Sequence, residues 1–326
     1  MKQRIVYLLV TLLFLWACTS RDPLPSWNDT DMKTKIIDFV ETQVPNIPVP
    51  DRLAVFDMDG TIACEEPLWL EMYCAVHGLC LKSDKDTSLR SQLIYQLADS
   101  LRVNPKSQWA QSKWGPYIDT MVRTAFAGWD NEAYIEFSNK LVNTEKQPDY
   151  GMPLISTFYQ PMLELISYLK ENQFDVYIVS GSLQGLLWSV CPQAIRFERS
   201  HLIGTRQQME PVFYPDEKTA FILQPDIWMP GNNDNGKAQD IYSYIGKTPV
   251  FAFGNTTGDF GMFRLTSTST LPHACFLLNH DDAKREYAYL PWHGEGMPAW
   301  KDTMKNNGWN IVDMSKTFKT VWEKPR

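Results

Sequence analysis

The sequence lacks any block of lysine and arginine that could bind a polyphosphate backbone or an anionic lipid surface. Its 31 Lys and Arg are outnumbered by 38 Asp and Glu, which gives a net charge of −7. Beyond the first residues the basic side chains are scattered along the chain. We therefore do not expect nucleic acid as a partner.

Internal repeats and low-complexity segments are also missing, as is the composition of a disordered or fibrous protein. Charged residues make up 21% of the chain and hydrophobic residues 44%, far from the highly charged composition of disorder. A chain of 326 residues can bury one large core, or one core plus a smaller domain. The composition predicts a globular protein.

The six cysteines lack the CxxC spacing of a zinc site. Cys18 belongs to the N-terminal segment described next, and the other five are spread along the chain. A disulfide between Cys74 and Cys80 is compatible with an oxidising compartment. Cys64 is expected to be a small packed residue.

The N-terminus reads as an export signal. Lys2 and Arg4 precede the mostly apolar run Ile5–Trp16, which is too short to cross a membrane stably. Leu15–Cys18 resembles a bacterial lipobox, in which cleavage leaves a lipidated cysteine; an ordinary signal peptide cut near Ala17 is the alternative. We predict a signal peptide over 1–17, a lipid-anchored tether over 18–30, and a lipoprotein at a bacterial membrane, on the periplasmic or cell-surface side.

Strands alternate with helices along the rest of the chain, which predicts an α/β fold with a doubly wound parallel sheet. Asp31 is expected to cap a first helix, and a last helix follows Gly296. The polar turns that end the apolar runs mark the strand ends. The main expected elements are strands at 53–56, 174–179, 250–253 and 275–278 and helices at 161–172 and 237–245.

About a hundred residues separate the first two predicted strands, too many for a simple crossover. Their apolar residues fall mostly at helical spacing, as in Leu89, Leu93 and Leu97. The pattern predicts an inserted helical cap domain over 66–159. The catalytic core is then formed by 31–65 and 160–326.

Polar residues follow several of the predicted strands, where ligands bind in an open parallel sheet. Asp57 and Asp59 end the first strand, Ser180 and Gly181 the second, and Asn255 and Asp259 the third. Two carboxylates this close favour a hard cation, and Mg²⁺ takes few protein carboxylates together with phosphate oxygens. With Lys237 nearby in sequence order, the set suits phosphoryl transfer.

The order of these residues resembles the haloacid dehalogenase superfamily. Its four motifs are matched by Asp57–Thr61, by Ser180, by Lys237 and by Gly254–Asp259. The inserted segment resembles the helical cap of the phosphoserine phosphatase-like branch. The PLWLEMY and HDDAKREYAY segments resemble exported bacterial hydrolases of the superfamily.

The resemblance implies a Mg²⁺-dependent phosphomonoester hydrolase with an aspartyl-phosphate intermediate. Asp57 would be the nucleophile, and Asp59 would act first as a general acid and then as a general base. Ser180, Gly181 and Lys237 would hold phosphoryl oxygens, while Thr61 would support the loop and contact the phosphate of the substrate. The implied metal ligands are Asp57, Asp59, Asn255 and Asp259.

One position departs from the superfamily pattern. Asn255 stands where most members have a metal-binding aspartate, so the site loses one negative charge. Either Asp259 compensates for this charge or the metal is held more weakly. A non-catalytic exported binding protein on the same fold would tolerate this change. That function remains the alternative.

The expected substrate is a small phosphorylated metabolite, phosphoserine-like or another small phosphomonoester. Glu66 lies nine residues after Asp57, the offset at which the phosphoserine phosphatase-like branch has a glutamate that reads the substrate's amino group. Such a carboxylate also suits phosphocholine or phosphoethanolamine. The alternative is that Glu65 and Glu66 are a solvated pair at a helix start. The histidines, His280 among them, show no metal-ligand spacing and are expected to be satisfied or exposed.

Overall fold

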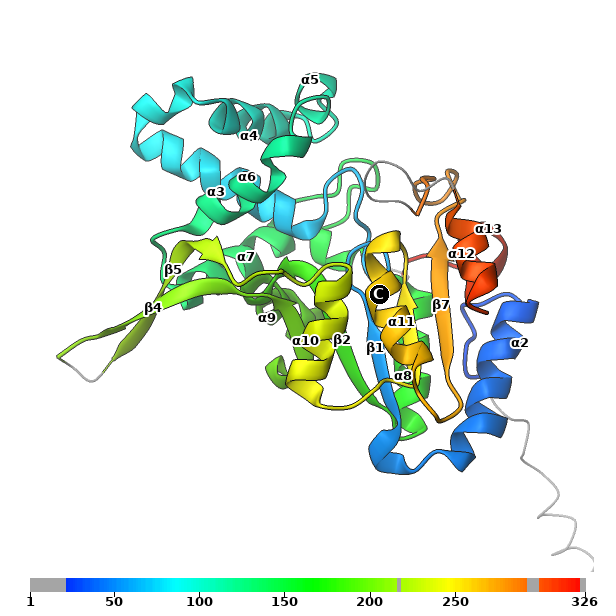
Figure 1. Cartoon of the computed structure of the whole chain (residues 1–326). Coiled ribbons are helices and arrows are strands. Elements are labelled where there is room, and N and C mark those ends of the chain that lie inside the picture. The colour runs from blue at the N-terminus through cyan, green and yellow to red at the C-terminus, as the bar shows by residue number, and fades with distance from the viewer. Residues whose placement is uncertain (1–21, 216–217, 292–298, 323–326) are drawn as a thin grey trace, which may run out of the picture.

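The computed structural model describes residues 22–215, 218–291 and 299–322 (Figure 1). The predicted signal peptide and Cys18 lie outside these residues, so both stay predictions. Among the described residues, no helix is long and apolar enough to cross a membrane.

A six-stranded parallel sheet forms the centre of the molecule, which confirms the predicted fold class. The strand order is β3-β2-β1-β6-β7-β8. The chain therefore adds β2 and β3 on one side of β1, and then returns to add β6, β7 and β8 on the other side. The strands are β1 (Leu53–Phe56), β2 (Asp175–Leu183), β3 (Leu202–Thr205), β6 (Phe251–Gly254), β7 (Ala274–Asn279) and β8 (Asn310–Asp313).

The four residues of β1 are all buried because helices cover both faces of the sheet. Successive side chains point to opposite faces. Ala54 and Phe56 pack in one hydrophobic cluster, whereas Val55 packs in the other. The two clusters are the two halves of the core.

Helices from different parts of the chain cover the two faces. The face of Val55 is covered by α10 (Asn235–Ile245), α11 (Phe260–Ser267) and α12 (Trp300–Asn306). The face of Phe56 is covered by α2 (Asp31–Asp38), α8 (Gln160–Glu171) and α9 (Gln184–Ala194). The short helix α13 (Met314–Thr317) follows β8.

The first helix begins one residue earlier than expected. Thr30, and not Asp31, is the N-cap of α2, because its hydroxyl accepts a hydrogen bond from the backbone N–H of Lys33 at 3.3 Å. Asp31 lies in the first turn of the helix, where its charge suits the helix dipole.

A helical insertion lies between β1 and α8, over the carboxyl ends of the strands (Figure 1). Its helices are α3 (Leu70–Lys85), α4 (Leu93–Val103), α5 (Gln108–Gln111), α6 (Ile118–Phe126) and α7 (Asn131–Thr144). We call these helices the cap.

An antiparallel hairpin packs on the cap, and the sequence analysis missed it. It consists of β4 (Gln207–Phe213) and β5 (Thr219–Ile227). In the cap loop, the Gly128 N–H donates a hydrogen bond to the Leu223 carbonyl in β5, and the Leu223 N–H donates one to the Trp129 carbonyl, both at 2.8 Å. The hairpin therefore extends the wall that the cap forms above the sheet.

The prediction of a tether does not hold for residues 22–30. Leu24 and Trp27 are fully buried, and the Trp27 indole donates a hydrogen bond to the Pro161 carbonyl at 2.9 Å. Two large apolar side chains gain more by packing than by remaining in solvent. This segment belongs to the folded core.

The five described cysteines are all free and buried. Cys74 and Cys80 both lie on α3, six residues apart, which separates their backbones by about 9 Å along a helix axis. This separation exceeds the reach of a disulfide, so the pairing considered from the sequence does not form.

Candidate active site

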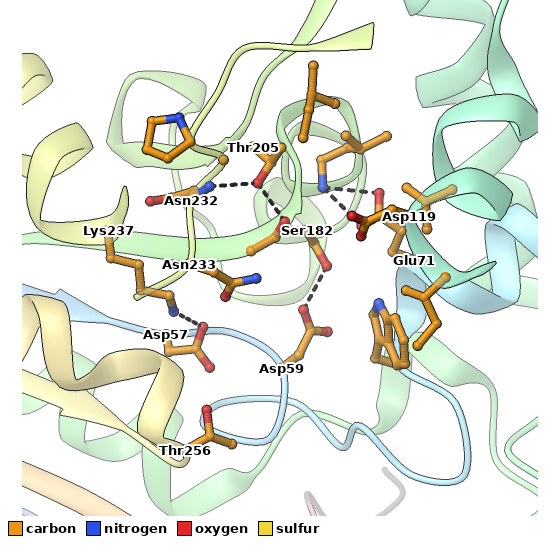
Figure 2. Close-up of a pocket in the computed structure, with 18 of the residues that line it drawn as sticks. Asp57, Asp59, Glu71, Asp119, Ser182, Thr205, Asn232, Asn233, Lys237 and Thr256 are labelled. Atoms are coloured by element: carbon orange, nitrogen blue, oxygen red, sulfur yellow. Dashed lines mark hydrogen bonds and ion pairs between the residues drawn. The ribbon is translucent and has the colours of Figure 1, made fainter. Parts of the chain in front are cut away.

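A cavity of about 340 Å³ lies at the carboxyl ends of the strands, between the sheet and the cap (Figure 2). The core contributes Asp57, Asp59 and Lys237 to its lining, while Trp69 and Val122 come from the cap side. Its position at the switch point around β1 is where open α/β sheets bind ligands. The volume suits a small molecule.

A tight turn after β1 brings both aspartates of the first motif to this cavity. The Met58 carbonyl accepts hydrogen bonds from the backbone N–H groups of Thr61, Ile62 and Ala63, at 2.9 to 3.2 Å. Gly60 has a φ of +71°, which is unfavourable for residues with a side chain. The turn therefore depends on the glycine in the Asp-Gly-Thr sequence.

Lys237 lies between two carboxylates. Its Nζ atom contacts Asp57 Oδ1 (Figure 2). The same atom lies 2.7 Å from Asp259 Oδ1 and 2.9 Å from the Val179 carbonyl. Burial and the charge of Asp259 raise the pKa of Asp57 well above its ordinary value, even though Lys237 lowers it. Burial alone would lower the pKa of Lys237, but Asp259 and Asp57 raise it, which keeps the ammonium charged.

Asp59 is held by two hydroxyl groups on β2. Its Oδ2 atom accepts hydrogen bonds from Ser182 Oγ at 2.8 Å and from Ser180 Oγ at 3.3 Å. Asp59 Oδ1 is buried and has no hydrogen-bond partner among the described residues. Burial raises the pKa of Asp59 to about 6, so this carboxyl can both donate and accept a proton near neutral pH.

The residues after 179, expected to leave the strand in a turn, still belong to β2. Strand β2 continues to Leu183, so Ser180 and Ser182 point to the same side of the sheet and both reach Asp59. Gly181 lines the cavity, where any side chain would lie 2.7 Å from the Asn233 amide. Ser180 and Gly181 were predicted from the sequence as site residues, whereas Ser182 was not.

Thr61 supports the loop from below the cavity. Its hydroxyl lies 3.1 Å from Asp57 Oδ2 and 3.2 Å from Asn255 Oδ1, and the side chain is fully buried. It is not among the residues that line the cavity. Thr61 therefore brings one oxygen of Asp57 and the amide oxygen of Asn255 close together.

This oxygen pair fits a hard cation. Carboxyl groups outnumber cations in the lining of the cavity. The carboxyl groups are those of Asp57, Asp59, Glu65, Glu71, Asp119 and Asp259, and the cations are Lys237 and Arg123. No group of three or more His, Cys, Asp or Glu side chains forms a closed metal cluster in the described part of the chain. An open site with few protein ligands is the kind that Mg²⁺ prefers.

Glu66 is not among the residues that line the cavity. The adjacent Glu65 lines the cavity, and so does Glu71 in the first turn of α3. Successive residues of the loop point in different directions, so an offset counted from Asp57 does not fix which glutamate faces the substrate. The role expected of Glu66 is not supported by its position.

Glu71 and two asparagines also belong to the site and were not identified from the sequence. Both carboxyl oxygens of Glu71 accept the backbone N–H of Leu183, at 3.0 and 3.1 Å, and burial raises its pKa to about 8. The Asn232 amide donates to the carbonyls of Ser180 and Ile203, both at 2.8 Å, and Asn233 lies over Gly181. These residues come from segments that only the folded chain brings together.

The segment from His280 to Tyr289 anchors the catalytic loop from outside the cavity. His280 Nε2 lies 2.6 Å from the Gly60 carbonyl, and His280 Nδ1 lies 3.0 Å from Glu286 Oε2. Glu286 Oε1 accepts hydrogen bonds from Cys64 Sγ at 3.1 Å and from Tyr159 at 2.9 Å. His280 is buried and satisfied, one of the two states expected from the sequence.

The sequence model for haloacid dehalogenase-like hydrolases matches residues 54–264, which include every position of the four motifs. The chain belongs to this family. The match also spans the cap and includes β2, β3, β6 and most of β1, whereas β7 and β8 lie beyond it.

Comparison with solved structures finds similar chains at low identity. A conserved functionally unknown protein from Anaerococcus prevotii DSM 20548 is 13% identical with a TM-score of 0.52, covering 84% of this chain and 94% of that one. A protein of unknown function from Bordetella pertussis Tohama I is 12% identical with a TM-score of 0.49, covering 81% and 98%. A substrate-bound phosphoserine phosphatase is 13% identical with a TM-score of 0.37, covering 78% and 98%. No curated protein matches the sequence significantly.

Proposed function

We propose that this hydrolase cleaves small phosphomonoesters through an aspartyl-phosphate on Asp57. The observation that carries the proposal is the pairing of two different carboxyl groups in one cavity. Asp57 is fixed by Lys237 and Thr61, whereas Asp59 titrates near neutral pH and keeps one oxygen unpaired. A nucleophile beside a group that can donate a proton is what phosphoester cleavage needs.

In the first half-reaction a carboxylate oxygen of Asp57 attacks phosphorus and the bond from phosphorus to the ester oxygen breaks. Asp59 gives its proton to the departing oxygen, which leaves as an alcohol. Lys237 stays charged between Asp57 and Asp259 and offsets negative charge on the phosphoryl oxygens. Gly181 and Ser180 would complete the cradle around this group.

In the second half-reaction water attacks the phosphorus of the aspartyl-phosphate. Asp59, now a carboxylate, takes the proton from water, and the bond from phosphorus to Asp57 breaks to release phosphate. Both starting states of the carboxyl groups are restored. The hydrogen bonds from Ser182 and Ser180 hold Asp59 in place through both steps.

Asp57, Asn255 and the backbone carbonyl of Asp59 are the groups that would hold Mg²⁺. When bound, the ion would supply positive charge to the phosphoryl oxygens and to the carboxylate cluster. Asp259, also expected as a ligand, has both oxygens engaged by protein donors, namely Lys237 and the backbone N–H groups of Asn255 and Thr256.

A hydrolysis panel of phosphorylated metabolites, run with Mg²⁺ and with a chelator, tests the proposal. We expect Mg²⁺-dependent phosphate release from several small phosphomonoesters and a labelled aspartyl-phosphate after acid quenching. Absence of turnover on the whole panel, together with binding of one of these metabolites, would instead support the non-catalytic binding protein.

A substrate with a cationic leaving group is the second candidate, because Glu65, Glu71 and Trp69 line the cavity on the cap side. An ammonium group could pair with the carboxylates and lie over the indole ring. The test compares phosphoserine, phosphoethanolamine and phosphocholine with glycerol phosphate, for wild type and Glu71→Gln. Equal loss of kcat/KM on all four substrates would remove Glu71 from amine recognition.

We also propose that the enzyme is an exported lipoprotein anchored through Cys18. The basic, apolar and cysteine-containing order of the first residues supports this proposal. Mass spectrometry of the mature N-terminus should find a lipid-modified Cys18. An unmodified N-terminus that begins after Cys18 contradicts it.

A further inference from the structure

The departure from the family pattern at Asn255 is matched by a second residue in the cavity. Asn255 Nδ2 donates a hydrogen bond to Glu65 Oε1 at 2.7 Å. This contact orients the amide so that its oxygen, Asn255 Oδ1, points away from Glu65 and lies 3.2 Å from the Thr61 hydroxyl. The same hydroxyl contacts Asp57 Oδ2, so the two oxygens lie side by side. Glu65 thus decides which end of the amide faces the predicted metal position.

Asp259 does not supply the charge that Asn255 lacks. Its Oδ1 atom forms an ion pair with Lys237, and its Oδ2 atom accepts the backbone N–H groups of Asn255 and Thr256 at 2.9 and 3.0 Å. The charge of Asp259 is therefore offset by Lys237, and its hydrogen-bonding capacity is used inside the protein. The missing negative charge has to come from elsewhere.

Glu65 and Asn255 meet directly over Gly60. A Cβ atom at Gly60 would lie 1.9 Å from Asn255 Nδ2 and 2.4 Å from Glu65 Oε1. The turn that presents Asp57 and Asp59 thus also leaves space for this pair. Glycine is needed here for close approach as well as for its positive φ.

We propose that Glu65 and Asn255 together replace the aspartate that most family members carry at position 255. Asn255 supplies the ligand oxygen, while Glu65 fixes the amide and supplies the negative charge. Glu65 is then a positioning residue for the metal site, since it acts through the Asn255 amide. This inference rests on the proposed Mg²⁺ dependence.

The test is Mg²⁺ binding to the substrate-free protein, measured by titration calorimetry. Glu65→Gln keeps an oxygen that can accept from Asn255 but removes the charge, and it should weaken Mg²⁺ binding on the order of 10- to 100-fold. Asn255→Asp, added to Glu65→Gln, should restore most of the lost affinity because it returns the charge to the ligand itself. Glu136→Gln, on an exposed position of α7, is the matched control.

The inference would be overturned if Glu65→Gln bound Mg²⁺ as tightly as the control variant does. It would also be overturned if the double variant bound Mg²⁺ no more tightly than Glu65→Gln. If Glu65→Gln does not fold, Glu65→Asp and Asn255→Asp are compared in its place, and Glu65→Asp should weaken binding while Asn255→Asp does not.

A parallel assay with p-nitrophenyl phosphate separates this inference from the proposed function. Turnover that a chelator does not change, with no Mg²⁺ binding by wild type, overturns the Glu65 proposal and leaves the phosphatase intact. Mg²⁺ binding that changes as expected, with no turnover on any phosphomonoester, supports the pair and overturns the phosphatase.

Discussion

The Nε2 atom of His280 donates a hydrogen bond to the backbone carbonyl of Gly60 at 2.6 Å, although 220 residues separate the two in the chain. Glu286 contacts the other ring nitrogen at 3.0 Å. Burial alone would lower the pKa of His280, but the hydrogen bond and charge of Glu286 raise it. The buried pair of His280 and Glu286 therefore holds the Gly60 carbonyl, directly after Asp59.

Replacing this histidine should affect both stability and turnover. His280→Ala leaves the Glu286 carboxyl group buried without its histidine partner, which costs about 3 to 5 kcal/mol in the free energy of unfolding. It also frees the loop that carries Asp59, so kcat should fall more than KM changes. Urea unfolding and steady-state kinetics measure the two effects.

His273→Ala, an exposed histidine just before β7, is the control and should leave both quantities unchanged. His280→Gln keeps one donor for Gly60 and should recover part of the kcat. A kcat of His280→Ala equal to that of the control would show that the contact does not position the loop.

Asp57→Asn should abolish turnover without unfolding the protein. An amide cannot act as the attacking carboxylate, so kcat should fall on the order of 10³-fold or more. Because burial already disfavours the charged form of Asp57, the neutral amide should leave the melting temperature unchanged or higher. Phosphate release measures kcat, and thermal unfolding measures the melting temperature. Asp38→Asn, at an exposed position, is the control. Residual turnover of more than a few per cent would remove Asp57 as nucleophile.

Elements with an apolar run or a helical period of their own could be predicted from the sequence, whereas others could not. The apolar strand Leu53–Phe56 and the helix after Pro161 were predicted in this way, and the structure has both. Strands β3 and β8 are also four residues each, but their sequences LIGT and NIVD mix apolar residues with glycine or polar residues, so no apolar run stands out. Their place in the sheet comes from pairing with β2 and β7.

The same division holds for the site. Asp57, Ser180, Lys237 and Asn255 could be named because each lies next to the end of an element whose position the sequence indicates. The choice between Glu65 and Glu66 depends on the path of a turn, which a residue offset does not encode. His280 shows its role only in the fold, where it meets Gly60 and Glu286.

Ser182→Ala tests the residue that strand alternation adds to the second motif. Ser182 Oγ makes the shorter of the two hydroxyl contacts to Asp59, at 2.8 Å against 3.3 Å for Ser180. Its removal should lower kcat about tenfold, because Asp59 then loses its fixed direction. Ser167→Ala, on an exposed position of α8, is the control. Equal kinetics for the two variants would place Ser182 outside the proton-transfer machinery.

The last prediction concerns Glu71 and the dependence of stability on pH. Burial raises the pKa of Glu71 from its ordinary value of 4.5 to about 8, so the folded protein binds this proton more tightly than the unfolded chain does. Folding then takes up a proton between these values, and this contribution to stability is full below pH 4.5 and is lost as pH rises towards 8. The loss amounts to at most about 1.4 kcal/mol for each pH unit.

Glu71→Gln can still accept the Leu183 N–H but carries no proton to release. Urea unfolding at several pH values should therefore show a stability advantage of Glu71→Gln over wild type that grows from pH 5 to pH 8 and then levels off. The exposed variant Glu136→Gln should follow wild type at every pH, and a parallel curve for Glu71→Gln would mean that Glu71 is ionised in the folded protein across this range.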